Sequence, residues 1–186
     1  MIVPDKMTDK ITLHGLGFIQ VVLEGNQRLH VWHPELPRRK CYEHSAIHNH
    51  RFEFISRVLV GTQRNTIFNH FSANDGLHMT YLHEGSRSRN GGRPWTEDGR
   101  ATFTVSTSQN ITAGKEYYMP PYVFHRSDPL GNGKAATIMR KTHEATAGAH
   151  SSCLIGVEPD RDFDRYQLSP KQLWEFVEDV LLGESA

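Results

Sequence analysis

The sequence predicts an all-β fold, an antiparallel sandwich or barrel, that ends in one α-helix. Two features of the chain lead to this prediction. Short segments rich in β-branched and aromatic residues follow one another at hairpin-like spacing, separated by clusters of Gly, Pro, Asn or Asp. One later segment repeats its apolar residues at helical spacing. The expected strands lie in segments 11–24, 28–33, 54–61, 64–71, 78–84, 101–113, 116–124, 135–141 and 151–157.

The helix is expected over about residues 169–182. Ser169 and Gln172 have the spacing of a capping box, and Pro170 stands at the first helical position, where its missing N–H costs no hydrogen bond. The apolar positions that follow form one stripe, which we expect to pack on the strands. This stripe consists of Leu173, Phe176, Val177, Val180 and Leu181, and Gly183 ends it.

A long polar segment, GSRSRNGGRPWTEDGR at residues 85–100, interrupts the strand pattern. Loops of this length in a compact domain are usually either functional lids or disordered. The Gly, Ser and Arg content favours disorder, because it offers little apolar surface to bury. We therefore expect a disordered loop, with a lid as the alternative.

Composition limits the chain to one domain. With 186 residues and 37% hydrophobic content, it can form a single core, so we expect one domain over residues 1–186, with the strands over about 11–158. Basic and acidic residues balance at 21 each, which argues against a nucleic-acid partner. The sequence has neither an apolar run near the roughly 20 residues of a membrane span nor an apolar signal core, so a cytoplasmic protein without a membrane partner is expected. Two cysteines without a CxxC motif, Cys41 and Cys153, indicate free thiols.

Histidines are the unusual part of the composition, with 12 in the chain. Two of them, His48 and His50, lie one residue apart in the stretch IHNHRFEF, among strand-forming residues. Residues i and i+2 of a strand face the same way, so both rings can reach one cation at roughly 2.0–2.2 Å. Taken alone, an HxH pair can also be two exposed strand residues, and a metal site needs at least a third ligand.

A second motif supplies the third histidine. In GKEYYMPPYVFH, Gly114 is followed after five residues by Pro120 and after four more by His125. With this motif the chain resembles the cupin superfamily, whose first motif is HxH followed by a strand-ending glycine, here His48, His50 and Gly61. The resemblance covers residues 45–126 and implies a jelly-roll β-sandwich in which the three histidines bind a metal ion.

One position departs from the usual cupin pattern. Most cupins have a glutamate ligand seven residues before the glycine, where this chain has Phe54, and Glu53 lies one position early. By strand parity Glu53 faces away from the histidines unless a bulge intervenes. A three-histidine set is similar to that of the cysteine dioxygenase type of thiol dioxygenases. Those enzymes have a Ser-His-Tyr run that is absent after His125, where the chain reads HRSD, so the resemblance does not extend to a thiol substrate.

Three neutral ligands suit a particular chemistry. They leave a divalent ion its full charge and open coordination positions, as a non-haem iron oxygenase requires. We therefore expect iron(II), with zinc, nickel, manganese or copper as alternatives that the sequence does not separate. Because only neutral imidazoles bind a metal, the site should fill above roughly pH 6 to 7.

Three further residues are candidates for catalysis. Arg28 lies on the same strand face as His30 and could bind a substrate carboxylate, although a position at the rim is the alternative. Arg140 shares parity with Ala136 and Ile138 and could also enter the barrel. Glu53 could carry protons even if it is not a ligand.

Three functions fit these features. The first is an iron-dependent oxygenase of the dioxygenase type that acts on a small polar or anionic substrate. The second is a metal-dependent isomerase or hydrolase-like cupin, and the third is a cupin that binds a small ligand without catalysis. We also expect a homodimer, because pairing would cover an exposed edge strand such as the one in segment 11–24.

Overall fold

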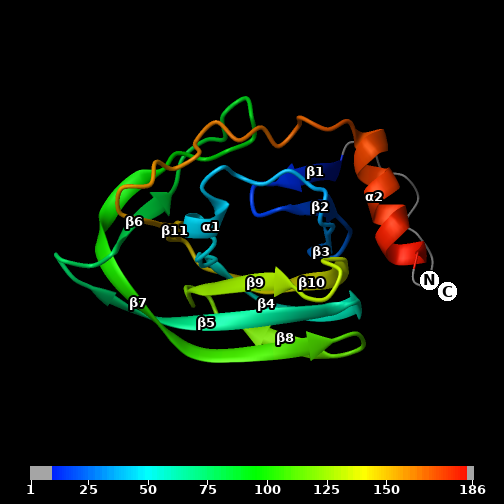
Figure 1. Ribbon diagram of the computed structural model, residues 1–186, viewed down its shortest axis with the longest axis horizontal. Helices are drawn as coiled ribbons and strands as arrows, with labels where there is room; N and C mark the ends of the chain where they lie inside the picture. The colour runs from blue at the N-terminus through cyan, green and yellow to red at the C-terminus, as the bar shows by residue number, and fades with distance from the viewer. Residues whose placement is uncertain (1–9, 184–186) are drawn as a thin grey trace.

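The fold is an all-β sandwich with a C-terminal helix, as the sequence predicts. The computed structural model describes residues 10–183. Two antiparallel sheets face each other and enclose the centre of the molecule (Figure 1). The six-stranded sheet has the order β1 (Ile11–His14), β2 (Phe18–Val22), β3 (Gln27–Trp32), β10 (Ala135–Glu144), β4 (Phe52–Val60) and β8 (Glu116–Met119). The five-stranded sheet has the order β11 (Ala149–Leu154), β6 (His78–His83), β7 (Thr96–Thr112), β5 (Thr62–Ser72) and β9 (His125–Pro129).

Turn residues set where several strands end. The predicted segment 11–24 is split into β1 and β2 at Gly17, which has a φ of 77° that few other residues adopt. Gly61, with a φ of 72°, reverses the chain between β4 and β5, so the glycine of the HxH motif ends its strand as expected. Pro120 and Pro121 end β8, and the next strand begins at His125.

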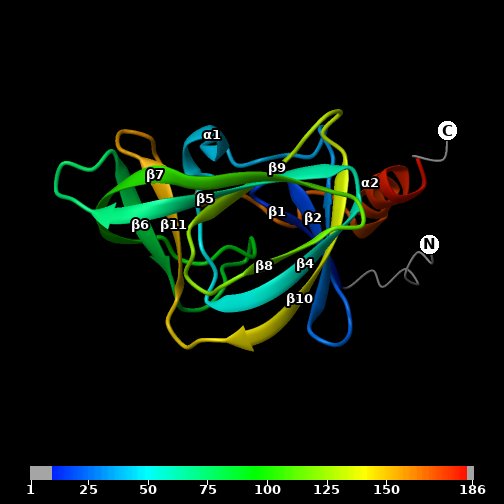
Figure 2. The same ribbon diagram turned by 90° about the horizontal axis from the view of Figure 1, so that it is seen from below.

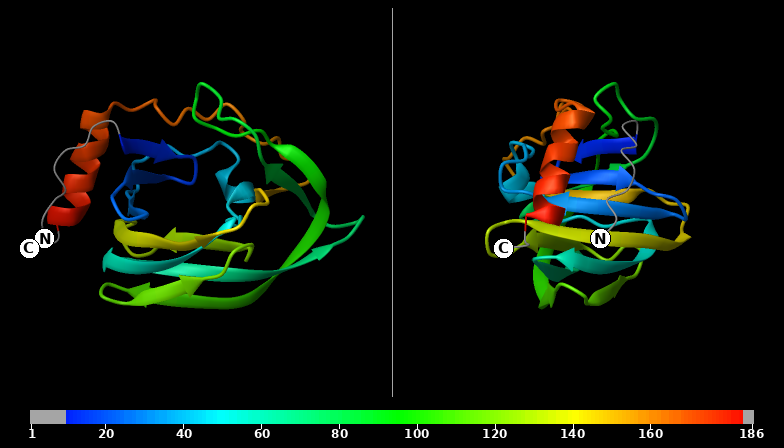
Figure 3. Two further views of the ribbon diagram at one scale, coloured as in Figure 1. Left: turned by 180° about the vertical axis from the view of Figure 1, so that it is seen from behind. Right: turned by 90° about the vertical axis from the view of Figure 1, so that its right-hand side faces the viewer.

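The C-terminal helix α2 (Pro170–Leu182) begins at the predicted capping box. The Ser169 side chain accepts a hydrogen bond from the Gln172 backbone N–H, and the Gln172 side chain accepts one from the Ser169 N–H. The helix lies on the outer side of β1, β2 and β3 (Figure 3). A second, short helix, α1 (Tyr42–Ser45), precedes the histidine pair. Within the described residues, neither helix is long and apolar enough to cross a membrane.

The largest apolar cluster lies under this helix and not between the two sheets. Leu29 and Val31 of β3 are 2% and 0% exposed and face α2. Residues that alternate with these two on β3, namely Arg28, His30 and Trp32, therefore face the space between the sheets. Helix residues in this cluster are Leu173, Trp174, Val177, Val180 and Leu181.

The polar segment 85–100 has a defined path in the structure, which contradicts the expectation of disorder, although most of its side chains are exposed. Its last residues, from Thr96 onward, belong to β7, a long strand that runs beside β5 (Figure 2). Trp95 is 8% exposed and stacks edge-on against Tyr81 at 5.3 Å between ring centroids. One tryptophan thus anchors a segment whose composition alone suggests no core contact.

The edge of β1 is partly covered within the chain itself. The Leu13 backbone N–H donates to the Arg165 carbonyl at 3.1 Å. The homodimer remains a prediction, and sedimentation at micromolar concentration tests it. Both cysteines are free thiols, as predicted, and both are buried in one cluster with Tyr81 and Trp95.

The helix should contribute strongly to stability. We expect Leu173→Ala to lower the free energy of unfolding by about 2–4 kcal/mol, because Leu173 is 1% exposed and its loss leaves a cavity under α2. Lys171→Ala, an exposed position of the same helix, is the control and should change it by less than about 0.5 kcal/mol. Urea denaturation measures both, and equal small effects would show that α2 does not close the core.

Candidate metal centre

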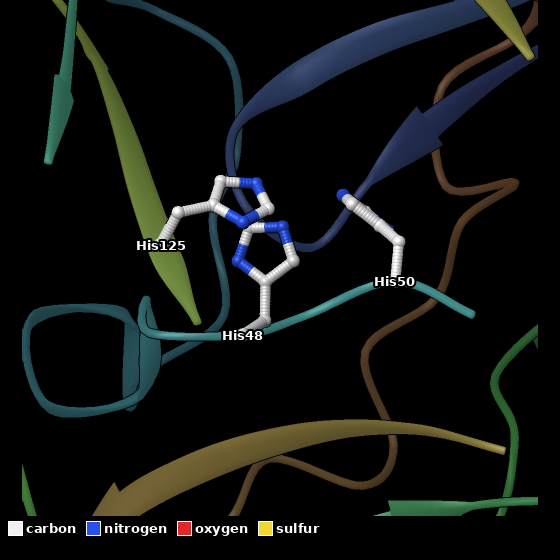
Figure 4. A group of neighbouring side chains, drawn as sticks. All are labelled: His48, His50 and His125. Atoms are coloured by element: carbon white, nitrogen blue, oxygen red, sulfur yellow. The ribbon is translucent and has the colours of Figure 1, made fainter. Parts of the chain in front are cut away.

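The three predicted histidines converge between the sheets (Figure 4). His125 begins β9, whereas His48 and His50 lie in an extended segment before β4 and not within a strand. His48 pairs with His125 through two backbone hydrogen bonds of 3.0 and 2.8 Å. Asn49 faces the other way and is hydrogen-bonded to His150 of β11, by its backbone N–H at 2.9 Å and its side-chain oxygen at 2.7 Å. These hydrogen bonds on both sides of the segment hold it in an extended conformation, so His48 and His50 point inward while Asn49 points the other way.

The rings lie close enough to share one ion. Their centroids are 4.5 Å apart for His48 and His125, 4.9 Å for His48 and His50, and 5.1 Å for His50 and His125. One nitrogen from each ring lies within 4.8 Å of the other two. In the described part of the chain this is the one group of histidine, cysteine or acidic side chains with such geometry.

Hydrogen bonds fix which nitrogen is available to a metal. Nδ1 of His48 lies 2.9 Å from the Ala46 carbonyl, and Nδ1 of His125 lies 3.0 Å from the Val123 carbonyl. A carbonyl only accepts, so Nδ1 carries the proton in both rings and Nε2 keeps its lone pair. Two of the three imidazoles are thus held in the tautomer that a metal ion needs, and this donor set fits a divalent metal.

Burial keeps these imidazoles neutral. Desolvation, followed by the proximity of His125, lowers the pKa of His48 to about 3. Desolvation likewise lowers the pKa of His125 to about 4, and it holds the pKa of His50 well below its usual value. Burial therefore favours the neutral form of these imidazoles below the pH 6 to 7 at which ordinary imidazoles become protonated.

An aromatic ring stands where most cupins have their carboxylate ligand. Phe54 is 4% exposed, and its ring packs edge-on against His50 at 5.5 Å between centroids. Glu53 lies on the outer face of β4, where its carboxylate accepts hydrogen bonds from Tyr118 at 2.6 Å and Thr142 at 2.9 Å. The prediction that Glu53 carries protons is therefore corrected, because strand alternation turns it away from the cavity.

The two predicted arginines lie on opposite sides of the sheet. Arg28 lines the cavity, with its guanidinium carbon 5.4 Å from the centre of the Phe52 ring. Arg140 is exposed and borders an outer groove, so its proposed entry into the barrel is wrong. It does share a face with Ala136 and Ile138, as predicted, but that face packs toward α2, and Met139 points inward instead.

The histidines lie in a cavity of about 240 Å³ whose wall is strongly cationic. Among the described residues, the one carboxylate in the wall is Glu144, which is ion-paired with Arg51 at 2.7 Å and Lys141 at 2.9 Å. Six arginines line the same cavity: Arg28, Arg51, Arg87, Arg93, Arg126 and Arg165.

Sequence reasoning missed most of this wall. Arg87 and Arg93 belong to the segment assigned to disorder, and Arg165 lies in the irregular segment between β11 and α2. The arginine content of residues 85–100 was the available signal. His14 and His83 also line the cavity, and no spacing in the sequence relates them to the metal ligands.

Comparisons with known proteins do not assign the chain to a family. No family model matches the chain, and no curated protein matches it. A solved structure of an oxalate oxidase is similar at 13% identity, over 99% of this chain and 79% of that chain, with a TM-score of 0.38. Likeness at this level says nothing about the reaction of this protein. The two-sheet fold and the three converging histidines agree with the resemblance to the cupin superfamily.

Removing any one of the three histidines should weaken metal binding strongly. We expect His48→Ala, His50→Ala and His125→Ala each to weaken Co(II) or Zn(II) binding at least 100-fold, because two imidazoles hold such an ion poorly. His143→Ala, an exposed residue of β10, should bind as the parent does. Isothermal titration after EDTA treatment measures the affinity for the metal. Unchanged affinity in the His125 variant would show that the three histidines do not form a metal site.

The metal-free protein should lose stability in acid. Between pH 6.5 and 4, unfolded His125 is protonated while folded His125, with its pKa of about 4, is largely neutral. The unfolded state therefore binds more protons, and the free energy of unfolding falls as pH falls, by roughly 1.4 kcal/mol per pH unit for each such histidine. Urea denaturation from pH 7 to 4.5 should show a shallower slope for His125→Gln and an unchanged slope for His143→Gln.

Proposed function

We propose that the protein is a metal-dependent enzyme of the non-haem iron dioxygenase type, acting on a small anionic molecule. One observation carries the proposal: three neutral histidines converge in a cavity whose wall holds six arginines. The histidine set supports a divalent metal, and the arginines support a negatively charged substrate.

His48, His50 and His125 would hold the metal through their free ring nitrogens. When bound, a ferrous ion supplies redox chemistry and open positions beside three neutral ligands. Apolar side chains line the cavity beside the histidines. Phe54 and Met139 are 4% and 3% exposed and line the cavity, and Phe52 stacks on His50 at 4.8 Å.

Two polar side chains can orient a substrate in the same cavity. Tyr117 donates its hydroxyl hydrogen to Oε1 of Gln63 at 3.1 Å. Burial raises the pKa of Tyr117, so its hydroxyl stays protonated near neutral pH and does not act as a base. Nε2 of Gln63 is buried without a hydrogen-bond partner, which leaves a donor for a substrate oxygen.

The cavity favours oxygenase chemistry over the isomerase or hydrolase alternative. Proton abstraction needs a free base, and Glu144 is held by two cations. Desolvation and the nearby Arg28 lower the pKa of His30 to about 3, which makes this ring a weak base. With Glu53 outside the cavity, the described wall offers no strong general base.

Oxygen consumption tests the proposal. Protein loaded anaerobically with Fe(II) should take up oxygen in the presence of one member of a panel of small carboxylic and phosphorylated acids, and Zn(II)-loaded protein should not. Arg28→Gln should lower kcat/KM about 10- to 100-fold, the range for a lost charge-assisted hydrogen bond of roughly 1.5–3 kcal/mol. Arg140→Gln and Glu53→Gln should leave it unchanged. Tight metal binding without oxygen uptake for any acid would favour the ligand-binding alternative.

A further inference from the structure

Three arginines from distant parts of the chain line the cavity and lie near enough to influence one another electrostatically. Arg28 comes from β3, Arg87 from the segment that precedes β7, and Arg165 from the segment that precedes α2. The last two segments lie side by side above β1 (Figure 1), and the Arg165 backbone N–H donates to the Asn90 carbonyl at 3.1 Å. Gly91 leaves room for the Arg165 side chain, because a Cβ at position 91 would lie 3.0 Å from Cδ of Arg165.

None of these three guanidiniums has a carboxylate partner among residues 10–183. Arg28 donates to Oε1 of Gln20 at 3.4 Å, and Arg87 donates to the Gly91 carbonyl. Arg165 donates to the Leu13 carbonyl at 3.1 Å and to Oγ1 of Thr12 at 3.3 Å. In contrast, two other arginines of the wall are neutralised, Arg51 by Glu144 and Arg126 by Asp128.

This arrangement is electrostatically costly for the protein alone. Burial, and then the neighbouring Arg87, Arg39 and Arg28, lower the pKa of Arg165 to about 10. Burial also lowers the pKa of Arg28, where the charge of Glu144 opposes this shift and the charge of Arg87 adds to it. Like charges in a partly desolvated site repel one another unless an anion is present to offset them.

A separate observation points to a ligand at the same place. His30 lines the cavity, and its Nε2 is buried without a hydrogen-bond partner. Its ring lies within the electrostatic influence of both Arg28 and Arg165. A buried polar atom without a partner is rare, and a ligand oxygen or ordered water commonly satisfies it.

We propose that Arg28, Arg87 and Arg165, together with His30, form a subsite for a dianionic group of the substrate. This inference rests on the proposed function, since it describes the non-reacting end of the molecule that would react near His48, His50 and His125. None of the three positive charges is ion-paired within the described residues, and a single carboxylate would offset only one of them, whereas a phosphate monoester or a pair of carboxylates would offset two. Guanidinium forks also match the several oxygens of such groups. The substrate class is therefore a small phosphorylated acid or a dicarboxylate.

Anion binding to the full-length chain tests this subsite independently of turnover. At pH 8, isothermal titration with inorganic phosphate, malonate and acetate should give 1:1 binding of a dianion at least 10-fold tighter than that of acetate. The result should hold before and after EDTA treatment. Preference for phosphate identifies a phosphorylated acid, and preference for malonate identifies a dicarboxylate. Equal affinity for acetate and both dianions would overturn the proposal.

Variants locate the binding. Arg28→Gln and Arg165→Gln should each weaken binding of the preferred dianion at least 10-fold, and Arg57→Gln, an exposed arginine on the outer face of β4, should not. Unchanged binding in both cavity variants would also refute the subsite. If a variant does not fold, phenylglyoxal labelling of the parent protein replaces it. The dianion should then protect Arg28 and Arg165 from modification but not Arg57, and equal labelling with and without the dianion contradicts the proposal.

These results separate two failures. If the subsite inference alone is wrong, the parent protein does not prefer a dianion over acetate, while metal binding by the histidines and iron-dependent oxygen uptake are still observed. Failure of the proposed function would show as absent oxygen uptake while the metal-free chain still binds the dianion through Arg28 and Arg165.

Discussion

The apolar contact between α2 and the outer face of the first three strands is the interaction on which the rest of the structure depends. Leu29 and Val31 face the helix, and the residues that alternate with them along β3 face the cavity. Burial of apolar area is the main favourable term in folding. Because that burial occurs largely under α2, the space between the sheets can carry arginines and histidines.

Backbone pairing then brings the three histidines of the candidate metal site together. The segment of His48 and His50 has no strand of its own, yet it is bound to β9 at His125 and to β11 at His150 and Ser152. The carbonyls of Ala46 and Val123 orient two of the rings. Two of the three rings are thus held by contacts outside the site, which would lower the cost of ordering them when an ion binds.

The wall of the cavity is positively charged because its described residues include no carboxylate that is free of an ion pair. Phe54 stands where a cupin carboxylate is expected, and Glu144 is occupied by Arg51 and Lys141. Neutral imidazoles do not reduce the charge of a bound cation, and the arginines add to it. A bound cation and the arginines would both add positive charge, and this common sign connects the histidine site with the proposed anion subsite.

The sequence by itself determined most of the strands, the C-terminal helix and the three histidines that the structure brings together. A period of two and the two spaced motifs identified His48, His50 and His125, because strand alternation and glycine-ended turns are local properties. The capping box located α2, and the alternation on β3 correctly put Arg28 beside His30.

Only the tertiary structure decided which face of each strand is inside. Arg140 shares its face with Ala136 and Ile138, as alternation requires, yet that face packs toward α2 and is as apolar as a core face. A sheet that is covered on both sides has two buried faces. The alternation of residues along a strand shows which residues share a face, but it does not show which of the two faces borders the cavity. Arg87 and Arg165 reach the cavity through contacts between segments far apart in the chain, and no local pattern encodes such a meeting.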